Sequence, residues 1–306
     1  MSDSRIRPDN LRMTIMDDES VQRLIELAMR EDMGAGDLSA GLLAGKDAPA
    51  DFQLLAKQTG VFCGCSIAQA VLKAYDESIE VHWTDAGCDG RLIETTPITL
   101  AAIQGPLGAI LSAERVLLNF LQRLSGIAAL TRRYVEAVAG TKCRVYDTRK
   151  TTPGWRVLEK YAVRCGGGFN HRMGLHDAVL IKDNHLTGVE THRLAGVMFD
   201  LLNRLSESAV KPNFVEVEAD SLAQVEALLK VVGIDGILLD NFPLDQMRQA
   251  VEMRDGLGLQ GKVWLEASGG ITLETVRAAA ETGVDRLSVG AMTHSAVALE
   301  DRKSVV

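Results

Sequence analysis

The sequence lacks the features that mark membrane proteins, exported proteins and most nucleic-acid-binding proteins. Its 306 residues contain no apolar run near the roughly 18–20 residues that a membrane-spanning helix needs. The amino-terminal segment, MSDSRIRP, has no hydrophobic signal core. Acidic residues outnumber basic ones by 41 to 33, and the net charge of −8 argues against non-specific binding to nucleic acids.

Cysteine is scarce and scattered. The chain has five cysteines, an odd number, and Cys63 and Cys65 are too close in sequence for ordinary disulfide geometry. No second pair accompanies them to complete a zinc site. The expected state is therefore buried or incidental thiols in a reducing cytoplasm. A nucleophile is missing as well, because neither Ser125, Ser268 nor Cys165 lies in a recognisable catalytic motif.

The first part of the chain predicts a helix followed by short strands. Apolar residues at helical spacing predict a helix over residues 20–30, and Gly34 and Gly36 follow it. Short strands are expected at 52–56, 79–83 and 98–103, which indicates an α/β sandwich over residues 1–117. A long helix is expected over residues 112–138, with Gly126 as a candidate break.

The second part repeats short apolar runs that end in polar residues or glycine. These runs lie at 144–148, 178–182, 213–218, 236–240, 263–268 and 286–290, and helical patterns such as 222–231 and 273–282 lie between several of them. Parallel strands need a crossover, usually a helix, and strands covered on both faces are continuously apolar. This rhythm predicts an α/β fold with a β/α barrel from residue 118 to 295. The tail, 296–306, is expected to pack on the sandwich.

Functional side chains of a β/α barrel lie at the carboxyl ends of its strands. The predicted strands end at Thr148, Arg149 and Lys150; at Lys182; at Glu218; at Asp240; at Ser268, Gly269 and Gly270; and at Val289, Gly290 and Ala291. His171 and Arg172 follow a glycine run at 166–168. So many cations in one mouth would repel one another unless a multiply charged anion binds there.

Each of these residues also has a simpler interpretation. A single arginine or lysine is more often a solvated surface charge, although Lys182 ends an apolar run and so favours a buried stem. Glu218 and Asp240 are either structural ion-pair partners or ligands of ribose hydroxyls and Mg²⁺. The two glycine loops are either plain turns or phosphate cradles.

The segment from Asp147 to His185, DTRKTTPGWRVLEKYAVRCGGGFNHRMGLHDAVLIKDNH, resembles the core of the quinolinate phosphoribosyltransferase family. Further similar motifs are AER at 113–115, LNFLQ at 118–122, SGI at 125–127, VEVE at 215–218, LLDNF at 238–242, EASGG at 266–270 and VGA at 289–291. The resemblance covers most of the chain in order.

The resemblance implies an N-terminal α/β sandwich domain and an atypical, seven-stranded β/α barrel. It implies a glycosyltransferase that moves phosphoribosyl from 5-phosphoribosyl 1-diphosphate to quinolinate with decarboxylation. The products are nicotinate mononucleotide, diphosphate and CO₂, in NAD biosynthesis. It further implies Mg²⁺ as cofactor and a homodimer, or a higher oligomer, whose sites are shared between subunits.

The resemblance also implies roles for individual residues. Lys150, Lys182, Glu218 and Asp240 would be catalytic, and Glu218 and Asp240 would face the ribose and hold Mg²⁺ through the diphosphate. Arg115 would reach in from the partner subunit. The two quinolinate carboxylates and the phosphates would be held by Thr148, Arg149, Lys150, His171, Arg172 and Lys182. The 5-phosphate would lie on Ser268, Gly269 and Gly270 and on Val289, Gly290 and Ala291.

Three other functions are compatible with the same residues. One is a paralogous, molybdenum-associated transferase with another substrate, which the intact His171-Arg172 pair and Lys182 argue against. A second is an aldolase that forms a Schiff base on Lys182, which would need an apolar pocket and a depressed lysine pKa. The third is a non-catalytic phosphate sensor.

Overall fold

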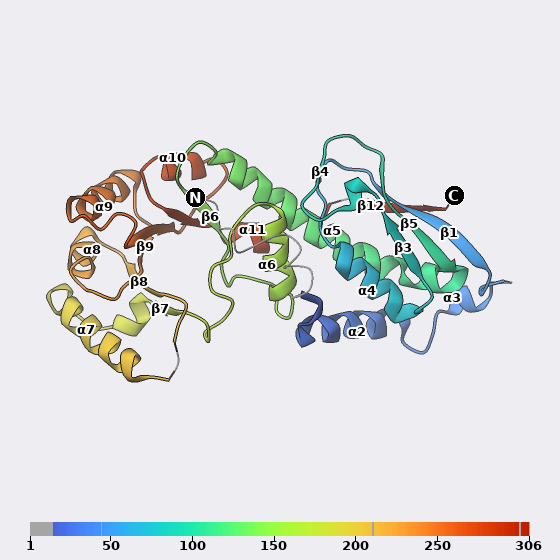
Figure 1. Cartoon of the computed structure of the whole chain (residues 1–306), viewed down its shortest axis with the longest axis horizontal. Helices are drawn as coiled ribbons and strands as arrows, with labels where there is room; N and C mark the ends of the chain where they lie inside the picture. Colours follow the sequence, from blue (N-terminus) through green and yellow to red (C-terminus); the bar gives the residue numbers. More distant parts are fainter. Residues whose placement is uncertain (1–14, 44, 210, 300, 306) are drawn as a thin grey trace. The chain divides into compact units, whose positions relative to one another are not determined.

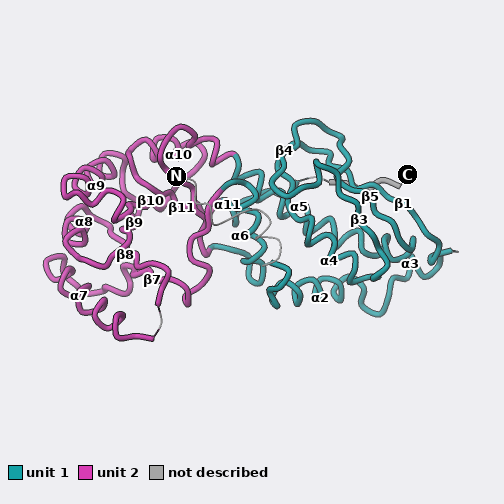
Figure 2. The backbone as a smooth tube through the Cα atoms, viewed as in Figure 1, with its two compact units in different colours: residues 1–132, 150–167, 292–306 teal, residues 133–149, 168–291 magenta. Residues whose placement is uncertain are grey.

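The computed structural model describes residues 15–43, 45–209, 211–299 and 301–305. The chain divides into two compact units (Figure 2): unit 1 takes in residues 1–132, 150–167 and 292–306, and unit 2 residues 133–149 and 168–291. The boundary expected at residue 117 falls within one long helix, whereas the units divide near that helix's end. Residues 300 and 306 of the tail lie outside the described part. No described helix is long and apolar enough to span a membrane.

Unit 1 is built on an antiparallel sheet with the strand order β12-β1-β5-β3 (Figure 1). The strands are β1 (Pro49–Ala56), β3 (Glu80–Trp83), β5 (Ile98–Pro106) and β12 (Asp301–Val305), and a separate pair is β2 (Gly60–Val61) with β4 (Leu92–Ile93). β12 runs antiparallel to β1, with Val305 opposite Phe52. All three strands expected in this region are found.

The helices of unit 1 include the predicted first helix. They are α2 (Glu19–Met33), α3 (Leu38–Gly41), α4 (Cys65–Tyr75), α5 (Leu107–Ala137), which begins in this unit, α6 (Arg156–Cys165) and the short η1 (Asp85–Gly87); α11 (Ala291–His294) begins at its border. Asp18 caps α2 by accepting a hydrogen bond from the Ser20 N–H, and Val21 and Ile25 are its buried residues.

Helix α5 runs through Gly126 without a break, so the candidate break is wrong. Glycine is required there for a different reason. A Cβ atom on Gly126 would lie only 2.1 Å from the carbonyl oxygen of Val297, so the tail backbone packs directly against the helix at this position.

Unit 2 is a parallel sheet covered by helices, and the predicted α/β class is confirmed. Its strand order is β6-β11-β10-β9-β8-β7. The strands are β6 (Arg144–Tyr146), β7 (Val179–Ile181), β8 (Val215–Ala219), β9 (Gly236–Asp240), β10 (Trp264–Ser268) and β11 (Arg286–Ser288). Each predicted run overlaps one strand. The helices are α7 (Thr191–Glu207), α8 (Leu222–Leu228), α9 (Leu244–Gly256) and α10 (Val276–Ala280), with η2 (Asp183–Leu186) after β7.

The sheet curls into an open barrel with its helices outside (Figure 1). Instead of seven strands, the described residues form a six-stranded sheet plus one parallel bridge, between Tyr146 of β6 and Phe169. Two residues after that bridge, His171 lies 2.8 Å from Glu216 of β8, so residues from distant parts of the sheet meet in the interior. On the outer side, Val217, Ile237 and similar apolar residues are fully buried.

Alternate strand residues point into the barrel and form three layers. In the amino-terminal layer the Arg286 guanidinium lies 3.6 Å from the ring centroid of Trp264 and 4.6 Å from that of Tyr146. Gly236 makes room there, because a Cβ on it would lie 2.0 Å from the indole Nε1 of Trp264. The middle layer holds His171, Glu216, Glu266 and Ser288, and the mouth layer holds Lys182, Glu218, Asp240 and Ser268.

Candidate active site

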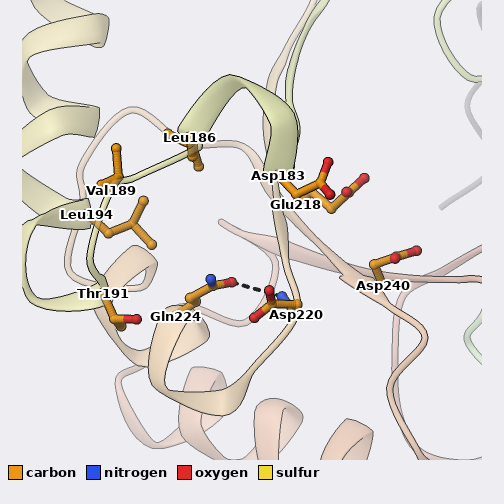
Figure 3. A pocket seen from close by; sticks show the side chains of 9 residues that line it. All are labelled: Asp183, Leu186, Val189, Thr191, Leu194, Glu218, Asp220, Gln224 and Asp240. Carbon is orange, nitrogen blue, oxygen red and sulfur yellow. Dashed lines mark hydrogen bonds between the residues drawn. The ribbon is translucent and has the colours of Figure 1, made fainter.

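A cavity of about 190 Å³ opens at the carboxyl ends of β8 and β9. Its acidic side chains are Asp183, Glu218, Asp220 and Asp240, and Leu186, Val189, Thr191, Leu194 and Gln224 complete the lining (Figure 3). Of the predicted residues, Glu218 and Asp240 line this cavity. Asp183 and Asp220 were not among the predicted site residues. Asp183 directly follows Lys182, and Asp220 directly follows the end of β8. Their positions next to a strand end are the signal that could have identified them.

Lys182 forms an ion pair with Glu218 at this mouth. The lysine side chain is 42% exposed and the glutamate side chain 8%. A lysine that forms a Schiff base needs an apolar pocket, whereas Lys182 is partly exposed and faces a carboxylate. The pair therefore argues against the aldolase. Because the Lys182 side chain is partly exposed, its ammonium group could leave Glu218 and bind an anionic ligand instead.

Arg149 and Arg172 are close enough to repel each other. Arg172 is buried, at 7% exposure, and its Nη1 donates a hydrogen bond of 3.2 Å to the carbonyl oxygen of Ala178. Its pKa is lowered by burial and by the Arg149 charge, while Asp177 and Glu216 act in the opposite direction. Guanidinium groups bind carboxylate and phosphate well, so an anionic ligand would offset this repulsion.

His171 lies one layer deeper than the sequence analysis expected. Its side chain is 7% exposed, its Nε2 is 2.8 Å from Glu216 and 3.5 Å from Glu266, and its Nδ1 accepts a 2.8 Å hydrogen bond from the Arg172 N–H. Asp147 fixes the adjoining backbone, since it accepts hydrogen bonds from the His171 N–H at 2.8 Å and from Asn170 Nδ2 at 2.6 Å. In this structure the imidazole is engaged by the protein.

Glu266 is an unusual acid of the middle layer, and in the sequence it stands out only as part of the EASGG motif at 266–270. Burial raises its pKa to about 7, and the charge of Glu216 adds to this, while His171, Ser288 and Arg286 act in the opposite direction. Possible ligand atoms of His171, Glu216 and Glu266 lie within 4.8 Å of one another, which is metal-site spacing. The contacts of His171 with Glu216 at 2.8 Å and with Glu266 at 3.5 Å account for that closeness.

The first glycine loop interlocks the ends of β9 and β10. Gly269 has φ +93°, and a Cβ on it would lie 2.1 Å from Asn241 Oδ1. Asn241 itself has φ 56°, its N–H donates to the carbonyl oxygen of Ser268 at 2.8 Å, and its Nδ2 donates to Asp240 at 2.8 Å. Only glycine satisfies both the backbone conformation and the close approach. Gly270 also has a positive φ, of 61°.

The second glycine loop follows β11. Its Val289 N–H donates to the carbonyl oxygen of Tyr146 at 2.9 Å, which joins the loop to β6. Gly290 is half-buried and Ala291 begins α11. Phosphate binding at both loops stays a prediction.

Two predicted residues belong to unit 1. Arg115 is exposed on α5. Lys150 is exposed too, and its carbonyl oxygen accepts a 2.7 Å hydrogen bond from Thr293 Oγ1. Thr148, in unit 2, is half-buried. The contact of these three with the ligand stays a prediction.

Comparison with known proteins gives matches along nearly the whole chain. The family described as quinolinate phosphoribosyl transferase, N-terminal domain, matches residues 37–125, and its C-terminal domain matches residues 127–301. The chain is 40% identical over 281 residues to the nicotinate-nucleotide pyrophosphorylase [carboxylating] of Mycobacterium leprae, covering 90% of this chain and 94% of that one. A probable enzyme of the same name from Bacillus subtilis is 36% identical over 282 residues, covering 92% and 91%. The solved nicotinate-nucleotide pyrophosphorylase of Francisella tularensis superposes with a TM-score of 0.84 at 35% identity, covering 94% and 96%.

Proposed function

The chain belongs to the quinolinate phosphoribosyltransferase family, and on this premise we propose that it makes nicotinate mononucleotide for NAD biosynthesis. The reaction joins quinolinate to the phosphoribosyl group of 5-phosphoribosyl 1-diphosphate and releases diphosphate and CO₂. The structural observation that carries the proposal is the ion pair of Lys182 with Glu218 at the carboxyl ends of neighbouring strands, beside the cavity that Asp240 also lines. The Arg149 charge that lowers the pKa of the buried Arg172 is a second reason to expect an anionic ligand there. We also expect the enzyme to be cytoplasmic.

The cationic groups of the proposed site serve binding and orientation. Arg149, Arg172 and Lys182 would hold the two carboxylates of quinolinate, with Lys182 leaving Glu218 for the ligand. Fixing both reactants side by side lowers the entropic part of the barrier. A cationic site in a chain of net charge −8 also concentrates anionic substrates.

The acidic groups would act on the sugar. As diphosphate departs, positive charge develops on the ribose, and the carboxylates of Glu218 and Asp240 would stabilise it. Once the pyridine nitrogen carries the ribose, its positive charge stabilises the carbanion that CO₂ leaves behind. No covalent bond to the protein is needed, which agrees with the lack of a nucleophile motif.

The cavity fits Mg²⁺ brought by the diphosphate. Its donors are carboxylate oxygens, which are the ligands that Mg²⁺ prefers. Among the described residues, no three of Asp183, Glu218, Asp220 and Asp240 are close enough to form a ligand cluster by themselves. Glu218 and Asp240 would therefore share the ion with diphosphate oxygens, and the bound ion would offset the charge of the leaving group.

Calorimetric titration combined with product assay tests the proposed function. Quinolinate should bind, and nicotinate, which lacks one carboxylate, should bind at least about tenfold more weakly because it engages fewer cations. With 5-phosphoribosyl 1-diphosphate and Mg²⁺ present, diphosphate and CO₂ should appear in equal amounts. Binding without turnover would support the phosphate-sensor function instead. Turnover only with an acceptor other than quinolinate would support the paralogous transferase.

We further propose a homodimer in which Arg115 completes the partner's site. Mixing inactive Arg115→Ala and Lys150→Ala subunits should then restore about a quarter of the sites, because half of the random pairs are mixed and each mixed pair has one intact site. Mass spectrometry verifies the subunit exchange. If exchange is complete and no activity returns, Arg115 acts within its own subunit.

A further inference from the structure

Two buried glutamates lie beneath the mouth of the barrel, and their partners differ. Glu216 accepts a hydrogen bond on each oxygen, since Trp264 Nε1 is 2.8 Å from Oε1 and His171 Nε2 is 2.8 Å from Oε2. Glu266 Oε1 accepts a hydrogen bond from the Ser288 hydroxyl. Its Oε2 is buried and has no hydrogen-bond partner among the described residues. Both residues are 0% exposed.

These partners show which of the two glutamates is held by its neighbours. Indole N–H is only a donor, and His171 must donate from Nε2 because its Nδ1 accepts the Arg172 N–H. Two N–H donors occupy both oxygens of Glu216, so protein contacts fix the orientation of its carboxyl group. An unpartnered, fully buried oxygen on Glu266 instead favours the neutral acid, as does the direction of its pKa shift. Glu216 is therefore the member of the pair whose contacts orient its neighbours.

The same contacts connect Glu216 to Arg172. The imidazole of His171 is held edge-on to Phe214, with ring centroids 5.2 Å apart, and its two nitrogens join Glu216 to the Arg172 N–H. Turning the ring would break both hydrogen bonds. The orientation of the ring thus fixes the backbone N–H of Arg172, and with it the backbone position that carries the Arg172 side chain.

We propose that Glu216 is a positioning residue of the dicarboxylate site, which acts through His171 to hold Arg172 in place. The proposal deepens the proposed function and rests on it. Glu216 reaches neither substrate, because two protein donors occupy its oxygens and it is fully buried. Its effect should appear in the affinity for quinolinate more than in the rate of the chemical step.

Glu216→Gln and Glu266→Gln form a matched pair of variants. A glutamine at 216 accepts one of the two N–H groups and turns its own NH₂ toward the other, so either His171 or Trp264 loses its acceptor and the group that anchors the imidazole is no longer held on both sides. A glutamine at 266 replaces an already neutral acid. At a pH below 7, we expect Glu216→Gln to raise the KM for quinolinate at least about tenfold with kcat within about threefold, and Glu266→Gln to keep KM within about twofold. Thermal unfolding verifies that both variants fold.

A second readout does not depend on activity. The ¹⁵N chemical shifts of His171, assigned by comparison with His171→Asn, should show a protonated Nε2 and an unprotonated Nδ1 in the native protein. Glu216→Gln should change this pattern and Glu266→Gln should preserve it. Three results would each overturn the proposal. They are equal KM increases in both variants, an unchanged KM in Glu216→Gln, and one metal ion per chain that stays bound after chelation. A native protein without turnover would instead overturn the proposed function.

Discussion

Glu216 and Glu218 lie two residues apart on β8 and point into the same barrel, yet their surroundings differ. Glu218, in the mouth layer, borders a cavity of about 190 Å³ and pairs with the partly exposed Lys182. Glu216, one layer deeper, is fully buried and held by Trp264 and His171. One carboxylate has a partner that a ligand can displace. The other has partners that stay in place.

The difference shows how one strand supplies two kinds of function. A charge near solvent costs little to re-pair, so Lys182 and Glu218 are suited to binding and release. A charge in the dry interior is costly to disturb and therefore fixes geometry. In the proposed site, depth along the strand, rather than residue type, separates the groups that would touch the ligand from those that would orient them.

Lys182→Ala tests the mouth layer and should have the largest effect. Removing the cation that we propose holds a quinolinate carboxylate should lower kcat/KM by at least about 100-fold. The stability cost should stay near 1 kcal/mol, because the lost pair is partly exposed. Steady-state kinetics and chemical denaturation measure the two quantities.

Lys230→Ala is the matched control, since Lys230 also pairs with a glutamate, Glu226 at 2.8 Å, but at the end of the outer helix α8. It should leave turnover unchanged. Near-normal kcat/KM in Lys182→Ala would show that the mouth layer does not bind the ligand. The proposed difference in role between Glu216 and Glu218 would then be wrong.

Glu266→Gln tests the deeper layer through the pH dependence of stability. The folded-state pKa is raised to about 7, from an ordinary value of 4.5, so the folded protein keeps a proton that the unfolded chain loses. Stability from this group is complete below pH 4.5 and falls as the pH rises to 7, by about 3 kcal/mol in all. The variant should lack this decline in urea unfolding. Parallel curves for the two proteins would show that folding does not shift the pKa of Glu266.

Gly269→Ala tests the edge of the mouth and should have the smallest effect. The new methyl group meets Asn241 at 2.1 Å and has to occupy φ +93°, so the loop after β10 must shift. Affinity for 5-phosphoribosyl 1-diphosphate should fall about tenfold, equivalent to about 1.4 kcal/mol. Gly258→Ala is the control, with φ +67° and nothing within 4 Å. An equal loss of affinity for 5-phosphoribosyl 1-diphosphate in both variants would indicate general backbone strain instead of a specific role for the loop after β10.

Hydrophobic patterning was sufficient to locate the barrel strands. The run 236–240 coincides with β9, because strands buried on both faces must be continuously apolar. Gly126 shows where local reasoning failed, since glycine is a poor helix former on its own but is demanded here by Val297, 171 residues later. A long-range approach of this kind leaves no mark in the neighbouring sequence.

The candidate site was predictable at its strand ends but not in depth. Glu218 and Asp240 line the mouth because the carboxyl ends of parallel strands meet there. His171 follows a loop rather than a strand, so its spacing gave no information on how far it reaches into the interior. Asp147 and Glu266 were overlooked as individuals because their importance lies in contacts with residues 22 to 24 positions away.

Gly236 has a consequence for how this chain can evolve. The indole of Trp264 fills the space that any side chain at 236 would need, and the same indole donates the N–H that holds Glu216. A mutation to alanine at 236 would become tolerable only with a smaller residue at 264, which would remove that donor. The two positions are therefore expected to change together in descendants of this sequence, with position 216 obliged to adapt as well.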